Sequence, residues 1–329
     1  MPKGIGRQLN IGFAKEASRG VAESSATFWV PFNDLNVQEK VNMAVENQSY
    51  GVIEDSVNEV VAKRWMEGEV KALIGDKHFP LLLTSLLGTV NTSDNPDSNV
   101  AVKDHAITVG QTAQHPSLTT FLDDPLGAVD YKHANTMIEE LTIKFELGKI
   151  LEYSIKIKGK KGASATLTPS IVAENNFMPK HVAFKLATNL AGLDAASAVS
   201  IKSMTLKISS KLHDDDVLGS DEPADFLNTA LSVEGDIEAV WQNETDFKQA
   251  ALAGTAKAMR IDLNNSDVTI GAAAHPQITI DLAKVIFTGL TKAVKIDDVV
   301  MQTLGFKGHY STGDAKMLTI KATNTQASY

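Results

Sequence analysis

Apolar and polar residues alternate strictly along several stretches of this chain. In residues 141–147 every second residue is apolar, and Thr, Lys and Glu stand between them. Residues 151–158 and 204–208 keep the same period of two. Successive side chains of a strand point to opposite faces, so this pattern predicts strands with one face on a core and the other on solvent or a partner. Gly148 and Lys149, between the first two stretches, predict an antiparallel hairpin.

Two short segments predict helices. One covers residues 79–87 and ends at Gly88, and the other covers residues 246–253 and ends at Gly254. Glycine is the usual residue just after the last turn of a helix, because it adopts the left-handed conformation without strain. Each segment follows a predicted strand that contains a Glu-Gly pair. The chain is therefore predicted to be mainly β, with one short packed helix in each half.

Four short motifs occur twice, in the same order along the chain. The paired segments are 26–32 with 182–187, 67–72 with 234–239, 115–122 with 275–282, and 138–141 with 296–299. The second pair agrees in glycine and aliphatic position throughout, and in charge at its first and third residues. The largest difference in spacing falls on residues 209–228, which are rich in Asp, Gly, Ser and Pro and predict a long loop. Insertions belong in loops, so the shared order indicates an internal duplication.

The duplication predicts a division of the chain into five segments. These are an N-terminal arm (1–25), a first domain (26–162), a linker (163–180), a second domain (181–325) and a C-terminal tail (326–329). Each domain is expected to be an antiparallel β-sandwich or partial barrel with one packed helix. The arm shows no periodicity of its own.

The composition narrows the class of protein. The chain has 329 residues, of which 43% are hydrophobic and 22% charged, as is typical of a folded globular protein. Without cysteine, disulfides and thiolate metal sites are excluded. We expect no secretory signal and no membrane span, since the longest apolar stretch is far shorter than the roughly 20 residues that a spanning helix needs. Forty acidic against 31 basic residues do not favour nucleic-acid binding.

No arrangement of residues predicts catalysis. Nucleophile-elbow, phosphate-loop and zinc-protease motifs are missing from the sequence. His115 and His275 each precede a proline and are interpreted as turn residues. The run 213–216 could hold a cation, but it lacks the spaced ligands of a calcium loop and is interpreted as a loop tip. Glu139 and Glu140 are adjacent on a predicted strand, so they cannot flank one bond. We expect no enzyme, no cofactor and no metal site.

The order of these elements resembles that of the tail tube (major tail) proteins of long-tailed, siphovirus-like phages. The resemblance rests on the residues Gly4-Ile-Gly6-Arg7 and Gly20-Val21 of the arm, the strand 26–32, the strand Glu67-Gly68-Glu69-Val70, the helix 79–88 and the hairpin 141–158. Through the duplication it covers nearly the whole chain. It consists of patterns of strand, glycine and helix, not of invariant residues.

This resemblance implies a structural subunit of a virion tail that is assembled in the host cytoplasm. The inner sheets of the domains would join between subunits into a β-barrel around a lumen. A duplicated chain would close as a trimer with pseudo-hexameric symmetry, and the rings would stack into a hollow tube through which DNA passes without specific binding. The implied partners are further copies of the chain and the tape-measure, tail-terminator and baseplate proteins, with no membrane involved.

The resemblance also implies two kinds of site. Loops between early strands of each domain would reach the next ring, which points to Ser49, Tyr50, Gly51, Val52, Ile53, Glu54 and Asp55 in the first domain and to Asp214, Asp215, Asp216 and Gly219 in the second. Acidic residues on the outward face of the predicted hairpin are candidates for lining the lumen: Glu140, Glu146 and Glu152. The alternative is another virion β-protein, such as a decoration, baseplate or adaptor ring, that does not polymerise.

Overall fold

The chain folds as one antiparallel sheet with few helices. The computed structural model describes residues 5–97, 101–125, 127, 129–241, 247–294, 296 and 299–329. Strands make up 54% of the chain and helices 8%, which confirms the prediction of a mainly β protein. All the strand pairs are antiparallel, and the sheet is not closed into a barrel within the single chain.

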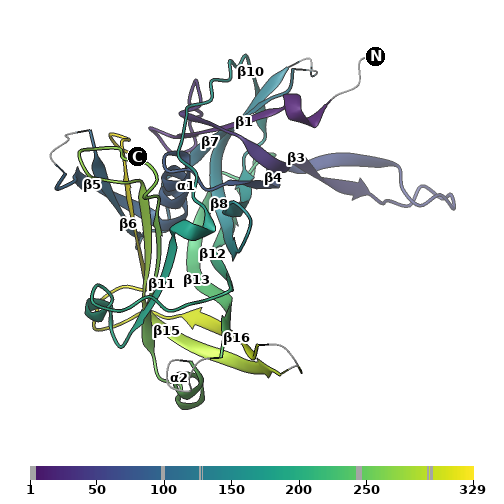
Figure 1. Ribbon diagram of the computed structural model, residues 1–329. Helices are drawn as coiled ribbons and strands as arrows, with labels where there is room; N and C mark the ends of the chain where they lie inside the picture. The colour runs from purple at the N-terminus through teal and green to yellow at the C-terminus, as the bar shows by residue number, and fades with distance from the viewer. Residues whose placement is uncertain are drawn as a thin grey trace.

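The elements follow each other in a simple order (Figure 1). The first half contains β1 (Asn10–Lys15), β2 (Phe28–Val30), β3 (Phe32–Glu46), β4 (Asn58–Leu73), α1 (His78–Leu87), β5 (Gly88–Asp94), β6 (Lys103–Val109), β7 (Leu118–Asp123), β8 (Asp130–Glu146), β9 (Glu152–Gly159) and β10 (Gly162–Ala165). The second half contains β11 (Val182–Ala187), β12 (Ser203–Asp215), β13 (Asp225–Val240), α2 (Lys248–Ala253), β14 (Lys257–Asn264), β15 (Gln277–Ala293), β16 (Met301–Gly308) and β17 (Leu318–Asn324). Short 3-10 turns lie at Gly6–Gln8, Pro179–His181 and Leu190–Gly192.

Eight strands form a central sheet in the order β3-β4-β9-β8-β12-β13-β16-β15. Two long strands of this central part also pair with strands outside it. The first part of β8 pairs with β7 and β10, and the first part of β15 pairs with β14 and β17. Most buried apolar side chains of both halves, together with those of α1, form one continuous core, and Ala14, Trp29 and Phe121 form a small second cluster.

The same pairing order occurs twice in the central sheet. In the first half β3-β4-β9-β8 are neighbours, and in the second half β12-β13-β16-β15 are neighbours. Gly68 lies between Val37 and Ile157, as Gly235 lies between Leu206 and Phe306. A β-bulge also follows at the same distance from each glycine pair, at Asn42/Met43 and at Lys211/Leu212. The motif pair 67–72 and 234–239 therefore marks structurally equivalent strands.

Other motif pairs do not mark equivalent strands. His115-Pro116 precedes β7, whereas His275-Pro276 precedes β15, which takes the place of β8 in the pairing order. The reason is an additional hairpin, β5–β6, which lies between α1 and β7 and has no counterpart between α2 and β14. The segment 26–32 spans β2 and the start of β3, while 182–187 is β11, which pairs with β14 as β1 pairs with β7.

Three further expectations concern the fourth motif, the second helix and the N-terminal arm. Asp297 and Asp298 of the fourth motif and Asp246 of the predicted second helix lie outside the described residues, and α2 begins at Lys248. The N-terminal arm contains the strand β1, which lies between β2 and β7. Its residues 11–14 are buried on both faces, and this explains why the arm shows no alternation.

Candidate assembly surfaces

One face of the central sheet packs on the core and the other carries polar side chains. On β8 the core side is Leu141, Ile143 and Phe145, and on β9 it is Tyr153 and Ile155, all nearly inaccessible to solvent. The residues between them, and their neighbours on β4, β12, β13 and β16, form what we call the polar face. Its charged members include Glu67, Glu69, Lys71, Glu140, Lys144, Glu146, Glu152, Lys156, Lys207, Glu234, Asp236, Glu238 and Lys307.

The three acids predicted for the lumen all lie on the polar face, but they differ in their surroundings. Glu140 binds the ammonium groups of Lys156 and Lys207, at 3.1 and 2.9 Å. Partial burial alone would raise the pKa of Glu140, but hydrogen bonds from these two lysines outweigh it and hold the pKa below the ordinary value. Glu146 pairs with Lys149 at 2.7 Å, and Glu152 accepts a hydrogen bond from Asn33.

Lysines lie among the carboxylates across the whole polar face. Glu67 stands directly opposite Lys158, and at the equivalent place in the second half Glu234 stands opposite Lys307. Opposite charges on paired strands stabilise the pair and leave no large field of one sign. Among the described residues, the polar face therefore carries both charges and no basic stripe.

The central sheet ends in two edges that have no neighbour. Within the described part of the chain, β3 pairs only with β4, and residues 286–293 of β15 pair only with β16. An unpaired edge presents a row of backbone N–H and C=O groups that can accept another strand. Where the two halves of the chain meet, β8 and β12 occupy the positions that β15 and β3 occupy at the open edges, and they pair with each other. This pairing runs from Glu140 opposite Ser209 to Glu146 opposite Ser203.

The outer part of the β3–β4 hairpin, residues 41–60, projects away from the rest of the molecule (Figure 1). We call it the free hairpin. The predicted stacking residues Ser49 to Asp55 form its tip and are all exposed. It also exposes large apolar side chains on its strands and at its tip: Val41, Met43, Val45, Tyr50, Val52, Ile53, Val57 and Val60. Such a concentration of exposed apolar groups is typical of an interaction surface.

The outer part of the β12–β13 hairpin, residues 210–230, lies against the first half of the chain instead. We call it the docked hairpin. Asp214 binds Lys63 at 2.8 Å and Lys158 at 2.7 Å, and Asp216 also binds Lys63. Asp221 binds Lys161 at 2.7 Å. The acidic run predicted as a solvated tip is thus largely engaged in ion pairs, while Asp215 belongs to the end of β12 and Gly219 lies at the exposed apex with a positive φ of 91°.

The polar face, the open edges and the projecting hairpin are features of a subunit that assembles with copies of itself. A family model described as phage tail tube protein matches residues 6–308. The chain belongs to the phage tail tube family. No curated protein matches it significantly. The resemblance to tail tube proteins is thereby confirmed, and the chain is a structural component of the virion tail that assembles with itself and other tail proteins.

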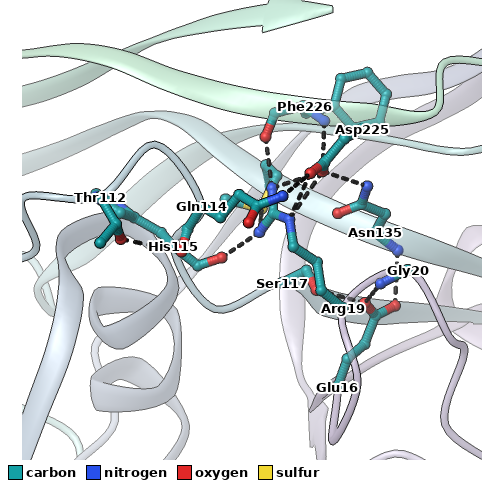
Figure 2. Close-up of polar contacts among 11 residues, drawn as sticks. Glu16, Arg19, Gly20, Thr112, Gln114, His115, Ser117, Asn135, Asp225 and Phe226 are labelled. Carbon is teal, nitrogen blue, oxygen red and sulfur yellow. Dashed lines mark hydrogen bonds and ion pairs between the residues drawn. The ribbon is translucent and has the colours of Figure 1, made fainter. Parts of the chain in front are cut away.

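A part-buried polar junction locks the docked hairpin of this tail tube protein to its first half (Figure 2). Arg19 donates from Nε to both carboxylate oxygens of Asp225, at 2.8 and 3.0 Å, and from Nη2 to the carbonyl of Phe226 at 2.6 Å. Its Nη1 donates to the carbonyl of His115. Asn135, with a positive φ of 50°, adds a hydrogen bond to Asp225 at 2.9 Å.

The turn that carries Arg19 is itself held by a buried carboxylate. Glu16 accepts hydrogen bonds from the backbone N–H groups of Gly20 and Asn135, at 2.6 and 2.7 Å. Ser117 and Thr119 donate their hydroxyls to the same carboxylate (Figure 2 shows Ser117). Because this network joins residues from the N-terminal arm, β7, β8 and β13, the sequence carries no local signal for it.

We expect Asp225→Ala to lower the free energy of unfolding by about 2–4 kcal/mol at pH 7, because the part-buried Arg19 would lose its carboxylate. Partial burial raises the pKa of Asp225, but hydrogen bonds from Asn135, Gln114 and the Phe226 N–H, with the Arg19 charge, hold it below the ordinary 3.8. The stabilisation is therefore complete above pH 3.8 and is lost as the pH falls through the lower folded-state value. The difference in unfolding free energy between the two proteins, measured with denaturant, should shrink as the pH is lowered below 3.8.

The described residues contain no group of side chains arranged to hold a metal ion. They also contain no helix with the length and apolar character needed to cross a membrane. The ring nitrogens of His115 lie 3.0 Å from the carbonyl oxygen of Leu86 and 3.2 Å from that of Gly110, and Nδ1 of His275 donates to the carbonyl oxygen of Val268 at 2.7 Å, so both histidines contact backbone carbonyls.

Proposed function

We propose that three chains close into a ring around a lumen and that these rings stack into a hollow tube for DNA passage. The observation that carries this proposal is the pairing of β8 with β12 inside the chain. The strand β15 occupies the same position in the second half as β8 does in the first, and β3 the same position as β12. An internal duplication, with each half as one tube domain, accounts for this equivalence.

The internal pairing supplies a register for the contact between chains. Thr142 stands opposite Lys207 and Ile143 opposite Leu206. Thr142 pairs with Ser154 as Thr291 pairs with Thr303, so Thr291 and Lys292 on β15 correspond to Thr142 and Ile143. Leu206 pairs with Gly235 as Val37 pairs with Gly68, so Val37 and Gln38 on β3 correspond to Leu206 and Lys207. We therefore place Thr291 of one chain opposite Gln38 of the next. Each junction would remove two open edges from the sheet.

The width of the resulting barrel favours three chains over two. Three chains with eight central strands each give twenty-four strands, and a spacing of about 4.8 Å with a tilt of 0–40° gives a backbone diameter of about 37–48 Å. Side chains extend about 5 Å from each wall, which leaves about 27–38 Å. Two chains would leave only about 14–22 Å, against roughly 20 Å for a DNA duplex.

The polar face would line this lumen, with Glu140, Glu146 and Glu152 among the lining residues. Its mixed charges support passage without retention, because DNA gains counterion release only from a cluster of basic groups. We further propose that assembly takes place in the host cytoplasm and that tape-measure, tail-terminator and baseplate proteins contact the interior and the ends of the tube.

Electron microscopy of the purified protein tests this proposal. We expect rings of three chains with a central channel, and stacks of such rings at high protein concentration. A protein that stays monomeric at high concentration would contradict the proposal. Isolated rings that never stack would favour an adaptor or decoration protein of the virion instead.

A further inference from the structure

We propose that the free hairpin of one chain docks sideways into a groove on the second half of the neighbouring chain in the same ring. This inference rests on the proposed ring, and it assigns residues 49–55 a contact within the ring in place of the stacking contact predicted from the sequence. The groove has a volume of about 900 Å³. One wall is formed by the second half, from Ser210 of β12, from β13, from the β16–β17 connection and from the start of β17, and the other wall by the end of β6 and the β6–β7 connection of the first half.

The docked hairpin is the internal precedent for this contact. It continues from the β8–β12 junction and lies on the first half of its own chain, where Asp214 meets Lys63 and Lys158. Asp221 meets Lys161, and its carbonyl accepts the backbone N–H of Arg64 at 2.6 Å. A hairpin that continues from the β15–β3 junction would reach the corresponding surface of the next chain.

Register relates the two hairpins residue by residue. Val45 stands opposite Glu59 as Asp214 stands opposite Phe226, each pair just beyond the equivalent bulge. The positions 41, 43 and 45 of the free hairpin thus correspond to 210, 212 and 214 of the docked one. Val41, Met43 and Val45 are 42–54% exposed, whereas their counterparts are buried or half-buried. Docking would bury the free hairpin in the same way.

The receptor residues also differ in chemistry between the two halves of the chain. Lys63 and Arg64 on β4 correspond to Ala230 and Leu231 on β13, by their equal distance from Gly68 and Gly235. Lys161 corresponds to Tyr310, since each lies two residues after the glycine that ends its strand. Ala230, Leu231 and Tyr310 all line the groove. At these three positions the charged receptor of the first half is replaced by uncharged residues in the second, although the groove also contains polar and charged residues such as Asp314 and Lys316.

The tip of the free hairpin has the matching chemistry. Asp221, which binds the charged receptor, corresponds to the segment 52–54 at the tip of the free hairpin. There Val52 and Ile53 are 61% and 102% exposed, and Tyr310 in the groove is 53% exposed. An acidic tip thus meets lysines inside the chain, and an apolar tip would meet Ala230, Leu231 and Tyr310 at the equivalent positions between chains. Burial of these side chains would stabilise the ring contact.

One charged pair is expected at the new contact. Inside the chain the Lys158 ammonium lies 5.7 Å from the centre of the Phe226 ring. The corresponding residues between chains are Lys307 and Glu59, and both are exposed. Opposite charges at a subunit boundary set orientation and partner choice. We therefore expect Glu59 of one chain to pair with Lys307 of the next.

The difference between the two receptors also gives the contact its specificity. An apolar free hairpin on the first-half receptor would leave Lys63 and Lys158 without their carboxylates, and burying an unpaired charge is costly. Each hairpin therefore fits one receptor. First and second halves would therefore alternate around the ring.

Charge reversal tests the proposal on the full chain. Glu59→Lys and Lys307→Glu should each raise the protein concentration needed for ring formation about tenfold. Gel filtration with light scattering measures the mass of the particles at each concentration. The double variant should recover most of the loss. Glu59 is exposed on the free hairpin, so the Glu59→Lys monomer should unfold like the unchanged protein. Lys307→Glu places a second carboxylate opposite Glu234, so its monomer should unfold at a slightly lower midpoint.

Three other results would overturn the inference. Single variants that form rings normally but no longer stack would assign the free hairpin to the contact between rings. Single variants that assemble fully would remove the hairpin from assembly. Failure of the double variant to recover, with both single variants folded and impaired, would refute the pairing of Glu59 with Lys307 and the docking pose with it. An unchanged protein that forms no rings contradicts the proposed function itself, so the two failures are distinguishable.

Discussion

Alanine in place of Gly68 or Gly235 is expected to destabilise the fold by about 3 kcal/mol or more. A Cβ on Gly68 would lie 2.2 Å from the carbonyl oxygen of Asn36 and 2.5 Å from the Cα of Val37. A Cβ on Gly235 would lie 2.0 Å from the carbonyl oxygen of Thr205 and 2.6 Å from the Phe306 ring. Because the obstacles include backbone atoms, a change of rotamer cannot relieve them, and the paired strands must move apart.

Thermal or denaturant unfolding measures this effect, with Gly313→Ala as the matched control. A methyl group on Gly313 would have no atom within 4 Å, and this residue lacks a positive φ, so alanine fits there without strain. The control should unfold at the midpoint of the unchanged protein. Equal midpoints for Gly68→Ala, Gly235→Ala and the control would show that the close strand crossing does not limit stability.

The hairpin of β8 and β9 is largely predictable from the sequence. Strand alternation predicts residues 141–147 and 151–158 as its strands, and the structure has β8 end at Glu146 and β9 span Glu152–Gly159. The beginning of β8, at Asp130, is not predictable in the same way. There residues 135–138 are buried in succession between β7 and the core, so neighbouring positions no longer alternate between apolar and polar.

The candidate site is predictable only where it repeats a local pattern. The outward position of Glu140, Glu146 and Glu152 follows from strand alternation, and all three lie on the polar face. The partners of Asp214 do not follow, since Lys63 and Lys158 stand 151 and 56 residues away in the chain. Arg19 and Asp225 are likewise 206 residues apart and belong to no motif. Contacts between residues so far apart in the chain can be predicted only when the strand order is known.

Motifs alone indicate the duplication, but two of the motif pairs lie on strands that are not equivalent. The structure replaces them with a better criterion, namely the shared pairing order and the matching bulges of β3–β4 and β12–β13. The proposed ring also explains why the two halves differ so much in sequence. One hairpin meets its receptor within the chain, and the other would meet a neighbour, so the two contacts need different chemistry.

The central claim, that β15 of one chain pairs with β3 of the next in a closed ring of three, can be tested with one pair of cysteines. The chain contains no cysteine of its own, so Gln38→Cys with Thr291→Cys introduces the only two thiols. These positions correspond to Lys207 and Thr142, which are directly opposite each other in the internal junction. Within one chain they lie at opposite ends of eight strands, about 34 Å apart, which no disulfide can span.

Oxidation of assembled protein, followed by denaturing mass measurement without reductant, gives the result. Each single-cysteine variant should remain at 35.3 kDa apart from random dimers. The double variant should give a covalent circle of three chains, about 106 kDa, that returns to single chains on reduction. A product that stays at the mass of one chain, or a ladder that continues past three chains, would contradict the account.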